Sequence, residues 1–179
     1  AYTYSPQGRI TRQDIYDATG TLSYSLHTEY DSKGNVIKES NTIGQTATSS
    51  YDENGNKIAY EDFSGRLKIA MTYDFSNRLI CTQETGDDQI IHTTHQKYDL
   101  KDNKIAATDP LGNTTSYAYD AIGNLTGATN PLGSATTFTY DAANRRIAIA
   151  DALNQTTSYT YDKAGRLTNL TDPLNNVTT

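Results

Sequence analysis

Residues 98–141 carry the pattern that organises the chain, and they read YDLKDNKIAATDPLGNTTSYAYDAIGNLTGATNPLGSATTFTYD. The phrase is Tyr-Asp, two variable residues, a glycine-like residue, a short strand, Pro-Leu-Gly, a second strand and Tyr-Asp again. It recurs at Tyr30-Asp31, Tyr51-Asp52, Tyr73-Asp74, Tyr98-Asp99, Tyr119-Asp120, Tyr140-Asp141 and Tyr161-Asp162. With Tyr4-Ser5 as a degenerate first copy, the spacings are 26, 21, 22, 25, 21, 21 and 21 residues. A nearly fixed period of this size indicates a tandem-repeat architecture.

Two positions in each unit accept only residues that tolerate a left-handed backbone, namely Gly, Asn or Asp. Four residues after the Tyr stand Gly8, Gly34, Gly55, Asn77, Asp102, Gly123, Asn144 and Gly165. Fourteen residues after it stand Gly44, Gly65, Gly112, Gly133, Asn154 and Asn175, the unit of residues 73–98 being irregular. A type I turn followed by a left-handed residue is a common hairpin connection, so each unit is predicted to contain two such turns.

The segments between the turns have the period-2 pattern of strands. The residue seven after the Tyr is Ile37, Ile58, Ile80, Ile105 or Ile147 in five copies and Thr11, Thr126 or Thr168 in the others. Aromatic residues alternate before the next turn, as in Tyr117 and Tyr119. Residues at i and i+2 of a strand point to the same face, so these segments predict strands rather than helices.

Strands joined by tight turns must run antiparallel to their neighbours. We therefore predict an all-β chain of tandem antiparallel β-hairpin repeats, with roughly sixteen strands in a long twisted or spiralling sheet. Residues 1–179 are predicted to form a single array of about eight units of about 21 residues. The first unit and residues 73–97 are irregular: Tyr16 to Gly20 predicts a second turn in the former, and Thr85 to Asp88 a longer exposed loop in the latter.

Composition narrows the classes of function. The net charge is −6 with no basic block, which argues against nucleic acid as the main partner. No apolar run approaches the roughly 18 residues of a membrane span. Cys81 is the single cysteine, so no internal disulfide is expected. Because the chain starts and stops inside a repeat, we interpret it as a piece of a longer array.

The repeats resemble the Rhs/YD-repeat family, whose motif is Tyr-Asp-x-x-Gly-Arg-Leu-Thr. The stretch from Tyr161 to Thr168 matches this motif at every fixed position, and those from Tyr119 to Thr126 and from Tyr30 to Ile37 are close. The resemblance covers essentially the whole chain. One such match would be weak, whereas eight in register are specific.

The resemblance implies a large secreted or cell-surface protein: a bacterial polymorphic toxin, an insecticidal toxin-complex component, a wall-associated protein or a teneurin. In that family the repeats form a spiralling β-sheet that closes into a hollow shell, which in the toxins encloses a C-terminal toxic domain. The self-cleaving segment that follows the repeats has no counterpart here, nor does a toxin domain. The implied partners are flanking repeats and an enclosed or attached C-terminal domain.

Candidate chemistry is sparse. His92 and His95 lie three apart, so in a strand they face opposite sides and make a poor metal pair. The stretch from Asp52 to Asn56 begins like a calcium loop, but Phe63 stands where the loop needs Glu. The regularly spaced aspartates recur with the turns, so turn capping explains them better than paired acid catalysis. We therefore predict no catalytic residue, no metal site, no cofactor and no enzyme activity.

The residues expected to carry the structure are the repeat positions themselves. They are Tyr30, Asp31, Gly34, Tyr51, Asp52, Gly55, Tyr73, Asp74, Tyr98, Asp99, Tyr119, Asp120, Gly123, Tyr140, Asp141, Tyr161, Asp162 and Gly165. The aromatic rows leave an alternative open. If buried, they form cross-strand ladders that hold the sheet, which is the outcome we expect. If exposed, they form a platform on which sugar rings stack, made by Tyr117, Tyr119, Phe138, Tyr140, Tyr159 and Tyr161.

Overall fold

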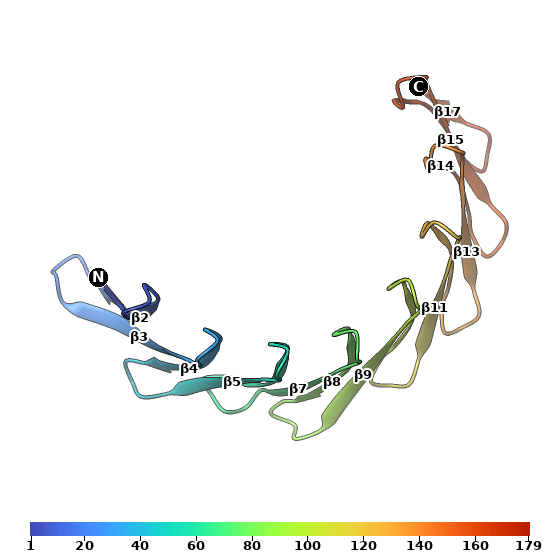
Figure 1. Ribbon diagram of the computed structural model, residues 1–179. Coiled ribbons are helices and arrows are strands. Elements are labelled where there is room, and N and C mark those ends of the chain that lie inside the picture. Colours follow the sequence, from blue (N-terminus) through green and yellow to red (C-terminus); the bar gives the residue numbers. More distant parts are fainter. The chain divides into compact units, whose positions relative to one another are not determined.

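The structure, a computed structural model, describes residues 1–179 as strands joined by tight turns, with no helix (Figure 1). There are 17 strands. The residues form two compact units, Ala1–Thr94 and His95–Thr179. The boundary falls within one strand, β9 (Ile91–Tyr98).

The first unit holds eight complete strands, each paired antiparallel with its neighbour in sequence. They are β1 (Tyr2–Tyr4), β2 (Ile10–Tyr16), β3 (Leu22–Tyr30), β4 (Val36–Asn41), β5 (Thr46–Tyr51), β6 (Lys57–Glu61), β7 (Lys68–Tyr73) and β8 (Leu79–Thr85). The turns alternate between the two edges of the meander. Those that begin at the aspartate of a Tyr-Asp pair, the Tyr-Asp turns, share one edge, and the second turns share the other.

The second unit repeats this arrangement with greater regularity. After the end of β9 come β10 (Lys104–Thr108), β11 (Thr114–Tyr119), β12 (Leu125–Thr129), β13 (Ala135–Tyr140), β14 (Arg146–Ala150), β15 (Thr156–Tyr161), β16 (Leu167–Thr171) and β17 (Val177–Thr178). Every consecutive pair from β9 to β17 is antiparallel. The prediction of an all-β chain of tandem antiparallel hairpins is confirmed.

The turns have the predicted backbone. All fourteen positions restricted to Gly, Asn or Asp have positive φ, from 60° at Asn154 to 95° at Gly34. In the last Tyr-Asp turn, Gly165 donates its N–H to the Asp162 carbonyl at 3.0 Å, and Asp162 donates its own N–H to the Arg166 carbonyl at 2.9 Å. These two bonds close a type I turn whose final residue is left-handed. The turn predicted at Tyr16 to Gly20 also forms, with Gly20 at φ 80°.

Replacing Gly165 with Val is expected to destabilise its hairpin through the backbone alone. Gly165 has φ +82°, and a Cβ added there meets no atom within 4 Å. A β-branched residue in this region costs about 1–2 kcal/mol of stability. Gly165→Asn is the matched control, because Asn144 and Asn175 occupy equivalent positions at φ 61° and 64°. Urea unfolding followed by circular dichroism should show a loss for Val and little change for Asn; equal losses would contradict this account of the turn.

The extra residues of the irregular repeat at 73–97 lengthen its strands and not the loop between them. β8 has 7 residues and β9 has 8, against 5 and 6 in β10 and β11. The five residues between β8 and β9 form a tight turn, in which Gln89 donates its N–H to the Gly86 carbonyl at 3.1 Å. The prediction of a long exposed loop around Thr85 to Asp88 was therefore wrong. Two residues added to each strand preserve the alternation of faces and give their backbone groups ladder partners, which a loop would not.

Neither unit has a sealed core. Strands contact only their neighbours in sequence, so each unit is one layer thick. Only Ala47, at 3% exposure, and Ser25, at 4%, are buried. In the second unit one face carries cross-strand pairs of larger side chains such as Phe138 and Ile149, and the other carries small pairs such as Thr139 and Ala148. Because little apolar area leaves water, hydrogen bonds and turn geometry must contribute an unusually large share of the stability.

Candidate functional site

In most copies the tyrosine that begins a repeat makes a hydrogen bond to the preceding repeat. In six copies its hydroxyl donates to a backbone carbonyl at 2.8–3.1 Å. The pairs are Tyr30 with Ile10, Tyr51 with Val36, Tyr73 with Lys57, Tyr119 with Lys104, Tyr140 with Leu125 and Tyr161 with Arg146. The acceptor is always the residue six after the preceding tyrosine of the series, counting Tyr4 as the first.

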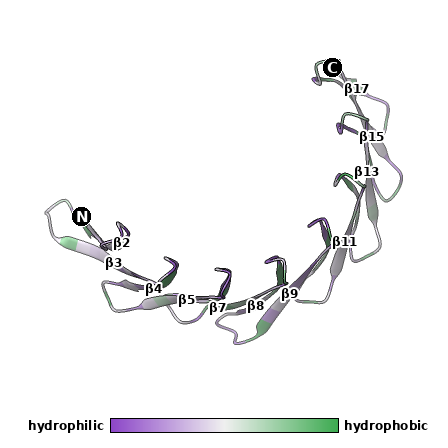
Figure 2. Ribbon diagram, in the orientation of Figure 1, coloured by the Kyte–Doolittle hydropathy of each residue, from purple (hydrophilic) through white to green (hydrophobic).

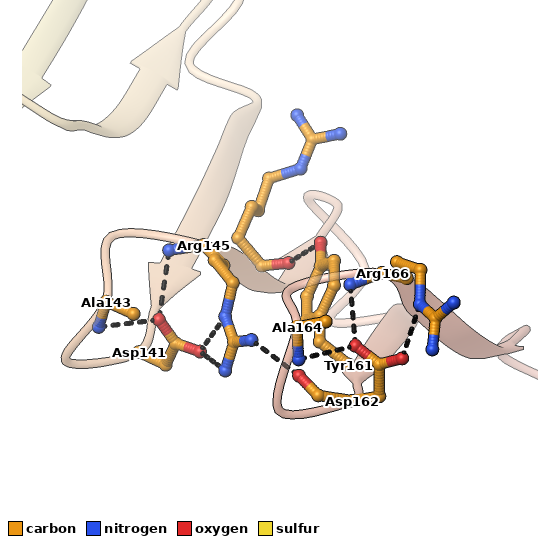
Figure 3. Close-up of polar contacts among 8 residues, drawn as sticks. Asp141, Ala143, Arg145, Tyr161, Asp162, Ala164 and Arg166 are labelled. Atoms are coloured by element: carbon orange, nitrogen blue, oxygen red, sulfur yellow. Dashed lines mark hydrogen bonds and ion pairs between the residues drawn. The ribbon is translucent and has the colours of Figure 1, made fainter.

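This hydroxyl compensates for a gap in the β-ladder. Between β14 and β15 the pair nearest the Tyr-Asp edge is Ala148 with Ser158, so the ladder ends before it reaches Arg146. The Tyr161 hydroxyl then bonds the Arg146 carbonyl at 2.8 Å (Figure 3). Neighbouring repeats are thus joined by backbone ladder bonds at one edge and by a side-chain hydroxyl at the other. A phenylalanine would fill the same space without this donor.

The aspartate that follows each tyrosine organises its own turn. The Asp141 Oδ1 accepts the backbone N–H groups of Ala143 and Arg145, both at 2.9 Å, and its Oδ2 accepts the Arg145 Nε at 2.7 Å (Figure 3). Hydrogen bonding from the Arg145 guanidinium, then from its backbone N–H, lowers the pKa of the Asp141 carboxyl below its ordinary value. Figure 2 shows the hydrophilic colour gathered at many of these turns.

Other copies achieve the same geometry with different partners. An asparagine amide takes the place of the guanidinium in Asn35, Asn56, Asn103 and Asn124. In two second turns the first residue is itself asparagine, and the Asn41 and Asn130 side-chain oxygens accept the same pair of backbone N–H groups. The turn therefore requires an oxygen acceptor at its first position, and the charge is an addition to it.

Neighbouring Tyr-Asp turns are also bonded directly to each other. The Arg145 Nη1 donates to the Asp162 carbonyl of the next turn at 3.1 Å, and its guanidinium carbon lies 4.9 Å from the centre of the Tyr161 ring (Figure 3). The Lys33 and Lys101 ammonium groups bond carbonyls of the next turn, those of Glu53 and Ala121. Arg145 therefore organises its own turn and binds the following one.

The six residues of the alternative aromatic platform are half-buried, so they are neither sealed in a core nor free in solvent. The hydroxyls of Tyr119, Tyr140 and Tyr161 are committed to backbone carbonyls. Basic groups lie over other rings: the Lys104 ammonium is 6.0 Å from the centre of the Tyr117 ring, and the Arg146 guanidinium carbon is 5.5 Å from that of Tyr159. Burial, and then the nearby Tyr117 and Asp99, raise the pKa of the Tyr119 hydroxyl.

No arrangement suited to catalysis or metal binding stands out. The His92 Nε2 lies 3.1 Å from the Asp88 Oδ2 beside the turn after β8. No group of three or more His, Cys, Asp or Glu side chains comes together as metal ligands. An open hollow of about 370 Å³ over β5 to β8 and the start of β9 is lined by Glu61 and Lys68, which form an ion pair 3.2 Å apart, and by no nucleophile paired with a base. No helix is long and apolar enough to cross a membrane.

Comparison with known proteins matches the regular part of the chain to a repeat family. The RHS repeat model matches residues 98–135, 119–153 and 140–177. No curated protein matches the sequence.

Solved structures show the same fold at low sequence identity. A crystal structure of TcdB2-TccC3-Cdc42 matches 98% of this chain at 15% identity with a TM-score of 0.67. One of TcdB2-TccC3 without its hypervariable C-terminal region matches 94% at 15% identity with a TM-score of 0.67. A Photorhabdus luminescens Tc holotoxin pore matches 94% at 13% identity with a TM-score of 0.54. This chain covers 12%, 11% and 14% of those chains, respectively.

Proposed function

We propose that this chain, which is an RHS-repeat protein, is a non-catalytic stretch of the wall of a β-shell in a larger secreted toxin or cell-surface protein. In this proposal the shell encloses or displays a C-terminal domain of the same protein. The observation that carries it is the hydrogen bond from the repeat tyrosine to the preceding repeat, which is made in six copies. Such a bond can be made again by every added unit, so the sheet can be extended to any length without a core.

The chemistry of the chain supports a structural role. Its repeated polar residues are engaged with one another: the aspartates with their own turns, and the tyrosine hydroxyls with neighbouring repeats. In Asp162, the Oδ1 accepts the N–H groups of Ala164 and Arg166, both at 2.9 Å, which leaves this oxygen occupied by the turn. Groups held in this way maintain a scaffold and are poorly placed to act on a substrate.

The likeness to chains in Tc toxin structures supports the proposal that this chain is one part of a larger repeat-containing protein. Residues 1–179 align with only 11–14% of those chains, which fits a single array that continues into further repeats. One of the matched proteins, TcdB2-TccC3, has a hypervariable C-terminal region. A wall of constant repeats around a variable region would allow one scaffold to accommodate different cargoes.

Limited proteolysis of the parent protein, purified from its source, tests the enclosure. We expect the C-terminal domain to resist protease while the repeats are folded, and to be cut once they are destabilised by Tyr119→Phe, Tyr140→Phe and Tyr161→Phe together. The same domain produced alone provides the reference for its intrinsic susceptibility. Cleavage of the domain at equal rates in the wild-type parent and in isolation would contradict enclosure.

A second candidate, a carbohydrate-binding or adhesion module, is favoured by the half-exposed aromatic rows. Nitration of the folded chain distinguishes the two. In a structural wall, Tyr119 and Tyr161, whose hydroxyls are bonded to backbone carbonyls, are expected to react more slowly than Tyr117 and Tyr159. Rapid reaction at all four, suppressed by an added oligosaccharide, would support the binding module instead.

A further inference from the structure

In the second compact unit, His95–Thr179, each second turn presents a leucine to solvent. Leu111 is 86% exposed, Leu132 90%, Leu153 77% and Leu174 81%. Each stands thirteen residues after a repeat tyrosine, so the four leucines recur at consecutive tips of the same edge. These four residues are called the leucine row. Exposed large apolar residues are ordinary when scattered, but a regular row of them along one edge is not.

Turn geometry does not explain the choice of leucine. The backbone N–H of Leu111 donates to the Asp109 Oδ1 at 2.9 Å, and that of Leu174 donates to the Asp172 Oδ1 at 2.9 Å. Any residue except proline supplies this N–H. In the Tyr-Asp turns of this unit the equivalent positions are filled by Lys101, Ile122, Ala143 and Ala164. The leucine side chains therefore have no role within their own turns.

The two edges of this unit differ in how neighbouring turns interact. At the Tyr-Asp edge, Arg145 and Lys101 form hydrogen bonds to the next turn. At the edge of the leucine row, the side-chain bonds of the turn aspartates stay within one turn, as between Asn113 and Asp109 at 2.9 Å. The Tyr-Asp edge thus satisfies its polar groups internally, and the opposite edge carries apolar side chains without an internal partner.

The spacing of the row limits what can cover it. Two strands separate consecutive tips, and paired strands lie about 4.8 Å apart, so the leucines recur about every 10 Å over about 30 Å. A single pocket would take one tip. A surface that engages all four at once must have the same period, and another array of these repeats has it by construction.

We propose that the leucine row is a docking surface for the leucine row of a second copy of this chain. Two identical rows placed side by side in opposite directions form a twofold interface in which every contact occurs twice. Each buried leucine removes on the order of 100 Å² of apolar surface from water. Eight leucines then bury roughly 800 Å², below the roughly 1,200 Å² of a stable standard interface. The dimer of this chain is accordingly weak and reversible.

Sedimentation equilibrium of the full chain over a range of concentrations tests the proposal. The expected result is a reversible rise in mean mass from 19.7 kDa toward twice that value as concentration increases. The variant with Leu111→Ser, Leu132→Ser, Leu153→Ser and Leu174→Ser should raise the dissociation constant at least tenfold. Its circular dichroism spectrum and melt should match those of the wild type, because the side chains are exposed.

Leu100→Ser with Ile122→Ser is the matched control. These residues are 98% and 69% exposed at tips of the opposite edge, so their loss should leave association unchanged. A wild-type chain that stays at 19.7 kDa at the highest concentration would overturn the proposal. So would a folded leucine-row variant that associates as strongly as the wild type, because association would then use another surface such as the edge strands.

Discussion

Acidification below about pH 4 is expected to unfold this chain steeply, because its turns depend on ionised aspartates. Hydrogen bonds hold the pKa of many of the turn carboxyls below the ordinary value of an aspartate. The largest cause is a hydrogen bond from a side-chain amide four residues on for Asp31, Asp52, Asp99, Asp109 and Asp172. It is a guanidinium for Asp74 and Asp141. For Asp17 and Asp62 it is a hydroxyl two residues on.

The direction of the effect follows from linkage. A carboxyl whose pKa is lower in the folded chain than in the unfolded chain stabilises the fold at pH values above the unfolded pKa, which is roughly 3.9. That contribution is lost as the pH falls through the folded value, when the protonated oxygen accepts hydrogen bonds poorly. Because the same group recurs turn after turn, the losses accumulate. Thermal melts between pH 7 and pH 2.5 should show a nearly constant melting temperature above pH 5 and a steep fall below pH 4.

Replacing Asp109 and Asp172 with asparagine provides the control. Asn130 already occupies the same turn position, and its side-chain oxygen accepts the Leu132 and Ser134 N–H groups at 3.0 and 2.9 Å. The double variant should therefore keep its turns at pH 7 and lose less stability on acidification than the wild type does. An unchanged pH profile would show that the acid sensitivity arises elsewhere.

Removing three tyrosine hydroxyls together is expected to lower the free energy of unfolding by roughly 1.5–4.5 kcal/mol. Tyr119→Phe, Tyr140→Phe and Tyr161→Phe each delete a donor to a carbonyl at 2.8–3.1 Å, and a hydrogen bond of this kind contributes about 0.5–1.5 kcal/mol. The half-buried rings remain in place, so the loss isolates the bond between repeats. Urea unfolding followed by circular dichroism measures it.

Tyr117→Phe with Tyr159→Phe is the matched control for this effect. Both rings lie half-buried on the same face of the sheet, and neither hydroxyl donates to a carbonyl of the preceding repeat. Their removal should change the free energy of unfolding by no more than about 0.5 kcal/mol. Losses of equal size per hydroxyl in the two variants would mean that the tyrosines act through polarity or packing of the ring rather than through the bonds between repeats.

The turns were predictable from the sequence because their requirements are local. A left-handed residue tolerates few side chains, so Asn77 and Gly165 reveal the same backbone although they differ in chemistry. The alternation of Tyr117 and Tyr119 likewise reveals a strand within a few residues. Because the same local patterns recur in every repeat, each prediction was supported several times. The repeated hairpin architecture then followed from the fixed order of turns and strands.

The bonds between repeats were not predictable in the same way. The Tyr161 hydroxyl bonds a residue fifteen positions earlier, and the acceptor is a backbone carbonyl that any residue supplies. The acceptor residues in other copies include Val36 and Lys104, which share no side-chain property. The available signal was the use of Tyr, never Phe, at this position in all the copies. The insertion before β9 was also ambiguous, because added residues can extend either a loop or a pair of strands.

A layer without a sealed core also explains why the repeats resemble one another so closely. In a globular domain, burial of apolar area tolerates many sequences. Here each repeat must supply one hydroxyl, two turn acceptors and two left-handed residues at fixed positions. The same dependence on neighbours makes the array extensible, which is the property that a shell wall requires.

Electron cryomicroscopy of the intact parent protein tests the central proposal most directly. The expected result is a closed β-shell in which the strands of residues 1–179 form part of the wall, with density for a further domain of the same protein inside it or attached to it. An open sheet or filament built from these repeats, with no associated domain, would contradict it.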